Sequence, residues 1–170
     1  MLALGPAFGA GFSVWGTLTI MGLIVRYQGQ LRNAGSLELL ASPWILIPAA
    51  VLFAADLIAG KVPRWDVRWH LRQGWIRVGG AAVIAFLAAG TLPVDVRLMV
   101  ALLAALAALA VHLARTGIHL GAHAAGTAPF AVPLAGVVED LLMFSLLLPL
   151  SVRRPELTLM MIGVVSIAMS

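Results

Sequence analysis

The stretch FAVPLAGVVEDLLMFSLLLPL, residues 130–150, places two adjacent acids inside an apolar run that is long enough to cross a lipid bilayer. About 20 apolar residues match the thickness of the hydrocarbon core. An ionisable side chain at the centre of such a helix costs about 2.5 to 3.5 kcal/mol on insertion scales. Glu139 and Asp140 therefore mark the position where a function should be sought first.

The composition of the whole chain agrees with this membrane assignment. Hydrophobic residues make up 62% of the 170 residues and charged residues only 11%, and the mean hydropathy is +1.03. About a quarter of the residues of a soluble domain are charged, so this chain has too little polar surface to cover a soluble globule. We predict an all-α, polytopic membrane helix bundle, a single transmembrane domain over residues 1–170, located as a multi-pass protein in the inner (plasma) membrane.

Apolar runs separated by charged connections predict six transmembrane helices. Their ranges are 8–25, 43–60, 77–92, 97–114, 131–150 and 155–169. We expect the first run to stay in the mature chain, since no basic residue precedes it and no small-residue cleavage site follows. The halves 1–93 and 94–170 each carry a proline-initiated helix with an acid, which is compatible with two inverted three-helix repeats. Any six-helix chain can, however, be cut into similar halves.

The connection at residues 61–76 is rich in arginine and tryptophan. Amphipathic aromatic rings and arginines suit the headgroup layer of a bilayer. The residues expected at this lipid interface are Trp65, Arg68, Trp69, Arg72 and Trp75. Recognition of a phospholipid headgroup is the sharper alternative. The clustered positive charge predicts a cytoplasmic position for this loop, so the net charge of +4 indicates contact with membrane lipids and no nucleic-acid partner.

The ionisable residues of several predicted helices lie at similar depths in the membrane. If the helices alternate in direction, the helical rise places Asp56, Glu139 and Asp140 at overlapping depths in one leaflet. The expected transport or polar site consists of Asp56, Arg77, His112, Arg115, Glu139 and Asp140. The two adjacent acids are about 100° apart around their helix, so one should face the bundle interior and the other a neighbouring helix or a second subunit. Either the acids line a hydrated cavity, or an arginine pairs with them and sets the helix register.

We predict no metal site, no cofactor and no enzyme activity. The chain has no cysteine, which excludes disulfides and thiolate sites. His112, His119 and His123 could share one helical face, and such a row can bind metal. A bare His-x-x-x-His lacks the glutamate of the metalloprotease signature, so we expect His119 and His123 on a polar or interfacial face instead. The sequence shows no nucleophile with a matched base and no phosphate-binding glycine loop.

A set of short polar and glycine motifs runs through the whole chain. They are Gly11-Phe12-Ser13, Ala41-Ser42-Pro43-Trp44, Asp56, Lys61-Val62-Pro63, Asp66, Trp69, Arg77, His112-Leu113-Ala114-Arg115, Gly117, Pro133 and Glu139-Asp140. This pattern resembles, end to end, a family of small bacterial integral membrane proteins, the domain of unknown function numbered four-one-two-six. The resemblance implies a polytopic membrane protein without an established activity. The chain departs from the pattern at Gly60, where an acid is frequent, at Gln73, where a histidine is frequent, and at Val132, where asparagine often precedes the proline.

These observations favour a small transporter or channel-like membrane protein that moves protons, a small cation or a small polar solute past the intramembrane acids. Two alternatives stay open: a non-transporting scaffold or accessory subunit whose charges set helix register, and a lipid-headgroup-binding membrane protein. The many alanines and glycines of residues 77–92 and 97–114 predict closely packed helices, and such small-residue faces can also support a homo-oligomer.

Overall fold

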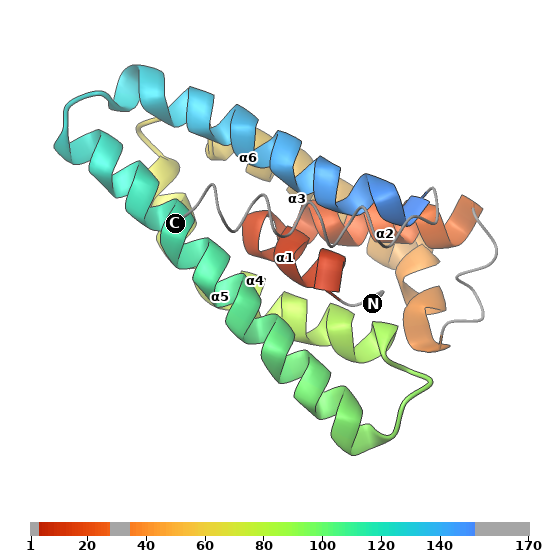
Figure 1. Cartoon of the computed structure of the whole chain (residues 1–170). Helices are drawn as coiled ribbons and strands as arrows, with labels where there is room; N and C mark the ends of the chain where they lie inside the picture. Colours follow the sequence, from red (N-terminus) through yellow and green to blue (C-terminus); the bar gives the residue numbers. More distant parts are fainter. Residues whose placement is uncertain (1–3, 28–34, 152–170) are drawn as a thin grey trace.

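The computed structural model describes residues 4–27 and 35–151, which form helices and turns with no strand in these ranges (Figure 1). The elements are α1 (Leu4–Phe12), α2 (Val14–Tyr27), the 3-10 helix η2 (Gly35–Ala41), α3 (Pro43–Ala59), α4 (Asp66–Ala88), α5 (Val94–Ala124) and α6 (Ala128–Ser151). The predicted all-α class is confirmed for this part of the chain. The sixth predicted span, residues 155–169, lies outside the described residues.

The predicted continuous helix at residues 8–25 is wrong in one respect, because it is interrupted at Ser13. The Ser13 Oγ accepts a hydrogen bond of 3.1 Å from the Gly16 amide, as an N-cap side chain does at the start of a helix. That bond takes the Gly16 amide away from the Phe12 carbonyl four residues earlier. As a result, α1 ends with a carbonyl that needs a donor from elsewhere in the molecule.

The predicted helices at 43–60, 77–92, 97–114 and 131–150 each overlap a helix of the structure, but two of these helices begin earlier or end later than predicted. The helices α3 and α6 lie close to the predicted ranges 43–60 and 131–150, whereas α4 begins at Asp66 inside the predicted loop, and α5 continues to Ala124. The first turns of α4 bury His70, Gln73 and Arg77. A search for apolar runs misses a helix whose inward face is polar, and this explains the difference.

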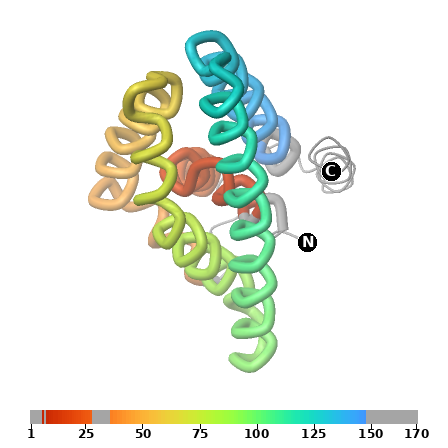
Figure 2. The backbone as a smooth tube through the Cα atoms, turned by 90° about the vertical axis from the view of Figure 1, so that its left-hand side faces the viewer, coloured from red at the N-terminus to blue at the C-terminus, as the bar shows by residue number. Residues whose placement is uncertain are grey.

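The short helix α1 lies in the middle of the bundle, in contact with α4, α5 and α6 (Figures 1 and 2). The helices α4 and α5 have the most extensive mutual contact, while α3 packs mainly against α2. Ala85 of α4 and Ala104 of α5 are buried together, and small residues of this kind let two helix backbones approach closely. The predicted tight packing of the small-residue faces is therefore present between these two helices.

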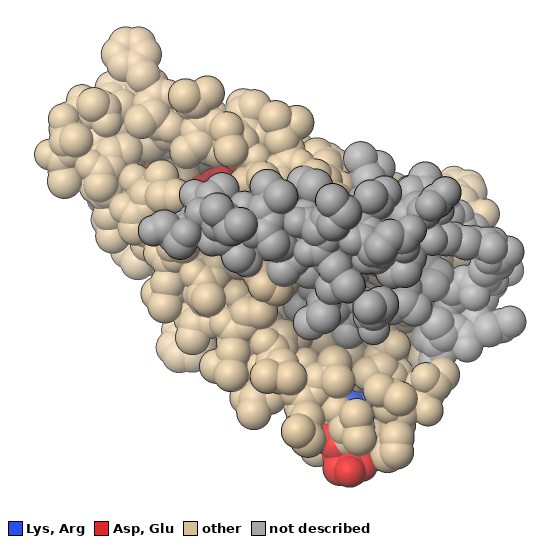
Figure 3. All heavy atoms as spheres, in the orientation of Figure 1, with Lys and Arg blue, Asp and Glu red and all other residues tan. Residues whose placement is uncertain are grey.

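The described surface is apolar while the interior holds charged side chains. Leu102 and Leu106 of α5 are 61% and 54% exposed, whereas Asp66 and Arg77 are fully buried. Two helices, Val94–Ala124 and Ala128–Leu147, are long and apolar enough to cross a bilayer, and only 22% and 33% of their most apolar windows are buried. The face in Figure 3 shows little charge outside one acidic patch at its lower end. Exposed apolar area of this extent indicates association with a membrane.

Candidate functional site

Asp56 of α3 and Arg77 of α4 form a buried ion pair. The Arg77 Nη2 lies 3.2 Å from the Asp56 Oδ1, and the two side chains are 0% and 4% exposed. The indole N–H of Trp69 donates to the same carboxylate oxygen at 2.7 Å. Arg77 also donates to the Gln73 Oε1 at 3.1 and 3.2 Å and to the Gly11 carbonyl at 3.5 Å. One arginine thereby joins α1, α3 and α4.

Arg115 of α5 and Glu139 of α6 form a second buried pair. The Arg115 Nε lies 2.5 Å from the Glu139 Oε2. The Arg115 Nη1 donates to the Phe12 carbonyl, which is the acceptor left free by the break after α1. Arg77 reaches the preceding carbonyl, that of Gly11. The two guanidinium groups thus occupy the C-terminal end of α1, where the helix dipole favours positive charge.

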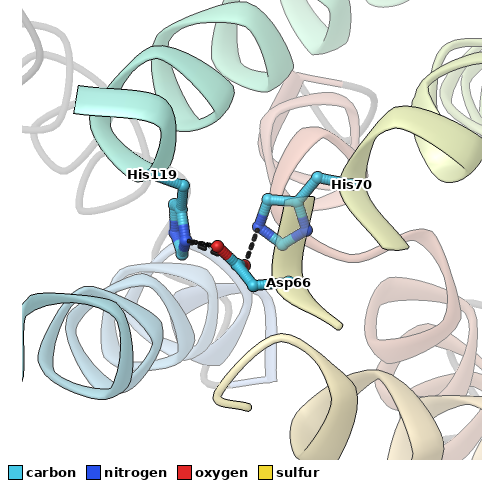
Figure 4. Close-up of side chains that lie close together, drawn as sticks. All are labelled: Asp66, His70 and His119. Atoms are coloured by element: carbon cyan, nitrogen blue, oxygen red, sulfur yellow. Dashed lines mark hydrogen bonds and ion pairs between the residues drawn. The ribbon is translucent and has the colours of Figure 1, made fainter. Parts of the chain in front are cut away.

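A third buried group surrounds Asp66, the first residue of α4. The His119 Nδ1 lies 2.9 Å from the Asp66 carboxylate, the His70 Nε2 3.4 Å and the His123 Nε2 3.5 Å. We call Asp66, His70, His119 and His123 the histidine cluster. Figure 4 shows the rings of His70 and His119 on either side of the Asp66 carboxylate, with their centroids 4.5 Å apart.

His119 connects the histidine cluster to the second ion pair, because its Nε2 lies 2.9 Å from the Glu139 Oε1. The buried carboxylates differ in the charge that compensates them. Asp56 and Glu139 each contact an arginine. Among the described residues, Asp66 forms ion-pair contacts only with imidazoles, together with the weak positive end of the α4 dipole. Asp66 is therefore the buried acid that no permanently charged side chain balances.

The adjacent acids Glu139 and Asp140 point to different neighbours. Glu139 is 6% exposed and, besides its contacts with Arg115 and His119, lines a cavity of about 340 Å³ whose other described walls are apolar. Asp140 instead pairs with the Lys61 ammonium. Glu139 thus combines a closed ion pair with a position at a cavity wall, while Asp140 ties α6 to the turn after α3.

Two predicted polar-site residues lie outside the three buried groups: Asp140, which pairs with Lys61, and His112. Its ring packs against α4, since a Cβ added at Gly74 would lie 2.8 Å from the His112 Nε2. Conversely, Asp66, His70 and His119 belong to the site although none was predicted as a polar-site residue, and His119, which was expected on a polar or interfacial face, is 1% exposed. The four-residue spacing of Asp66 and His70, which matches that of His119 and His123, is the signal that could have revealed them.

The predicted lipid-interface residues lie on the outer side of α4. Trp65, Arg68, Trp69 and Arg72 line a second cavity, of about 230 Å³. Trp75 lies outside its lining and is 87% exposed. Trp69 also contacts the interior, because its indole N–H donates to Asp56 while its side chain lines this outer cavity.

Comparison with known protein families gives one match. The family model described as Domain of unknown function (DUF4126) matches residues 1–170. The chain belongs to this family. The resemblance of the motifs is thereby confirmed, and no curated protein and no solved structure matches the chain. In this DUF4126 chain, a Cβ at Gly60 would lie 3.4 Å from the Arg115 Nη2 and 3.7 Å from the His70 Cε1. A carboxylate at position 60 would therefore reach the buried site.

Proposed function

We propose that the chain is a small multi-pass protein of the plasma membrane that moves a small cation through the polar site between α1, α4, α5 and α6. The proposal includes six membrane spans, with residues 155–169 as the sixth. The inverted relation between residues 1–93 and 94–170 stays a prediction from the sequence. No chemical reaction is part of the proposed activity.

Glu139 carries the proposal. It is a buried carboxylate that lines a cavity of about 340 Å³ and contacts Arg115 and His119 inside the bundle. That volume lies in the usual range of ligand sites, which combine mostly apolar walls with a few polar groups. Ionisable side chains in membrane helices typically mark ion or substrate pathways. A carboxylate that lines a cavity and also belongs to a charged network can transfer a cation from the cavity to that network.

The break between α1 and α2 gives separate support. Transporter sites are often built where a membrane helix is interrupted and its backbone carbonyls are freed at mid-depth. Here the freed carbonyl of Phe12 and the neighbouring carbonyl of Gly11 accept from Arg115 and Arg77. The interruption therefore lies at the level of the charged groups. Movement of either arginine would expose a carbonyl oxygen that can coordinate a cation.

Flux through reconstituted vesicles tests the proposal. The purified chain is placed in vesicles that hold a trapped dye for protons or for Zn²⁺, and the decay of an imposed gradient is followed. We expect the wild type to accelerate the decay and Glu139→Gln to slow it at least about 10-fold, because one essential charge is removed. Asp95→Asn, an equivalent neutralisation at an exposed position of α5, serves as the control and should retain flux.

Asp140→Asn separates the two neighbouring acids in the same assay. Asp140 contacts Lys61 and not Arg115 or His119, so its loss should affect flux less than the loss of Glu139. Wild-type flux in Glu139→Gln, with folded protein in the vesicles, would sink the transport proposal. Loss of flux in Asp140→Asn alone would contradict the assignment of the site to Glu139.

A non-transporting scaffold is the second candidate, favoured by the pairing of Asp56 with Arg77 and of Glu139 with Arg115. Paired buried charges can fix the register of helices without any cargo. Such a protein would show no flux, and neutralising Glu139 would lower its stability or its assembly with partners. Lipid-headgroup binding is a third candidate, supported by the cavity at Arg68 and Arg72.

A further inference from the structure

The histidine cluster consists of two pairs with the same spacing on neighbouring helices. Asp66 and His70 lie four residues apart on α4, and His119 and His123 lie four residues apart on α5. Residues with this spacing share one face of a helix, and α4 and α5 pack against each other. Asp66, His70 and His119 therefore converge on one point, and His123 approaches the same carboxylate to within 3.5 Å.

Two observations show that the donor atoms of the histidine cluster are suited to share a cation. His70 is fully buried and its Nε2 lies 3.4 Å from the Asp66 carboxylate, yet within the described part of the chain neither ring nitrogen forms a hydrogen bond of good geometry. His119 has a carboxylate oxygen 2.9 Å from each ring nitrogen. A neutral imidazole has a single N–H and can donate to only one of the two acids. The other nitrogen of His119 and its carboxylate both offer lone pairs, so a proton or a metal ion must lie between them.

We propose that the histidine cluster binds one divalent first-row transition-metal ion. Imidazole nitrogens with a carboxylate suit Zn²⁺, Fe²⁺, Co²⁺ and Ni²⁺, whereas Mg²⁺ and Ca²⁺ take oxygen ligands. The donor atoms of Asp66, His70 and His119 all lie within 4.8 Å of one another. Donors of a tetrahedral zinc site, with bonds of about 2.0 to 2.1 Å, are about 3.4 Å apart. To complete the site, the His119 Nδ1 and the Asp66 carboxylate, now 2.9 Å apart, would separate slightly, and the more distant donors would move closer.

His123 provides the fourth ligand and the access route. Its Nε2 lies 3.5 Å from the Asp66 carboxylate, and its side chain is 32% exposed while that of Asp66 is fully buried. A metal site needs a path by which the ion enters. An ion can meet the imidazole of His123 first and then pass to the buried ligands.

Glu139 fits this site as a positioning residue. The His119 Nε2 lies 2.9 Å from the Glu139 carboxylate, so the tautomer with the proton on Nε2 donates to Glu139 and leaves the Nδ1 lone pair for the metal. Metal-bound histidines usually donate their second N–H to such an acid, which fixes the ring and its tautomer. Arg115 holds Glu139 in turn. A metal ion as the cargo rests on the transport function proposed above, whereas metal binding itself does not require flux.

Metal titration of the full chain tests the site directly. The protein is purified in detergent without a polyhistidine tag, stripped with a chelator and titrated calorimetrically with Zn²⁺, with Mg²⁺ as the comparison ion. We expect one Zn²⁺ per chain and no binding of Mg²⁺. Bound Co²⁺ should give the visible absorption of a low-symmetry site with nitrogen ligands. His70→Gln should weaken Zn²⁺ binding about 100-fold or more, because even second-shell changes cost 10- to 100-fold.

His112→Gln is the matched control, since His112 is also a buried histidine of α5 but lies outside the cluster. It should bind Zn²⁺ like the wild type. Should His70→Gln not fold, His123→Gln changes a partly exposed ligand and should still weaken binding at least about 10-fold. Absence of stoichiometric binding to the folded wild type, or equal binding by His123→Gln and wild type, would overturn the site. If the chain binds Zn²⁺ but shows no flux, the metal site stands and the metal ion is not the cargo. If it shows flux but binds no Zn²⁺, the metal site is refuted and the transport proposal stands.

Discussion

Removing one partner of the Asp56–Arg77 pair should strongly destabilise the protein, because the other charge is left buried and uncompensated. At the observed separation of 3.2 Å, two unit charges attract by about 5 kcal/mol at an effective dielectric constant of about 20. Arg77→Met leaves the Asp56 carboxylate buried with Trp69 as its remaining hydrogen-bond donor. We expect the free energy of unfolding to fall by about 3 to 5 kcal/mol, the usual cost of an uncompensated buried charge.

The double variant with Asp56→Asn shows whether the pair itself is responsible. With both charges removed, no ion stays unpaired, so the combined loss should be smaller than the sum of the single losses by about 1 to 3 kcal/mol. Unfolding in mixed detergent micelles, followed by circular dichroism, gives the four free energies of this cycle. Asp95→Asn, at an exposed position in the first turn of α5, should lower stability by less than about 1 kcal/mol, the usual size of a helix-dipole contribution. Additive losses in Asp56→Asn and Arg77→Met would refute the coupling.

Two further predictions concern packing and lipid. Gly80→Ala should lower stability by about 1 to 3 kcal/mol through overpacking, since its Cβ would lie 2.2 Å from the Val14 Cγ2; Gly79→Ala, with nothing within 4 Å, should be neutral or stabilising. Equal stabilities of the two variants in the same unfolding assay would contradict this. Arg68→Gln and Arg72→Gln should each weaken binding of anionic lipid about fivefold relative to zwitterionic lipid. If native mass spectrometry shows the same occupancy of anionic lipid in these variants as in the wild type, the cavity does not bind lipid headgroups.

The residues that predicted the fold are those whose placement in a membrane helix costs free energy whatever their neighbours are. Glu139 in an apolar run is expensive wherever it points, so the sequence could show that the helix matters. The helical rise also placed Asp56 at the depth of Glu139 and Asp140, because it depends on residue number alone. The helical rise gives no information on how each helix is rotated about its own axis relative to its neighbours. It could not decide that Arg77 contacts Asp56 while Arg115 contacts Glu139.

The break at Ser13 was beyond prediction for a related reason. A serine inside an apolar helix often bonds to its own backbone and leaves the helix intact. Here the helix breaks because the Phe12 carbonyl has another donor, Arg115, which lies more than one hundred residues later in the chain. The local hydrogen bond from Gly16 to Ser13 and the distant one from Arg115 stabilise the same break, and only the folded chain brings them together.

Asp56 and Asp66 show how identical side chains acquire different roles from their neighbours. Both carboxylates are buried, and both contact polar side chains of α4. Asp56 contacts a guanidinium, which keeps its charge at any ordinary pH and cannot give way to a metal ion. Asp66 contacts imidazoles, whose nitrogens become metal ligands once a proton leaves. The charge on Asp56 is therefore committed to holding α3 against α4, while the charge on Asp66 stays available to a cation that arrives from outside the chain.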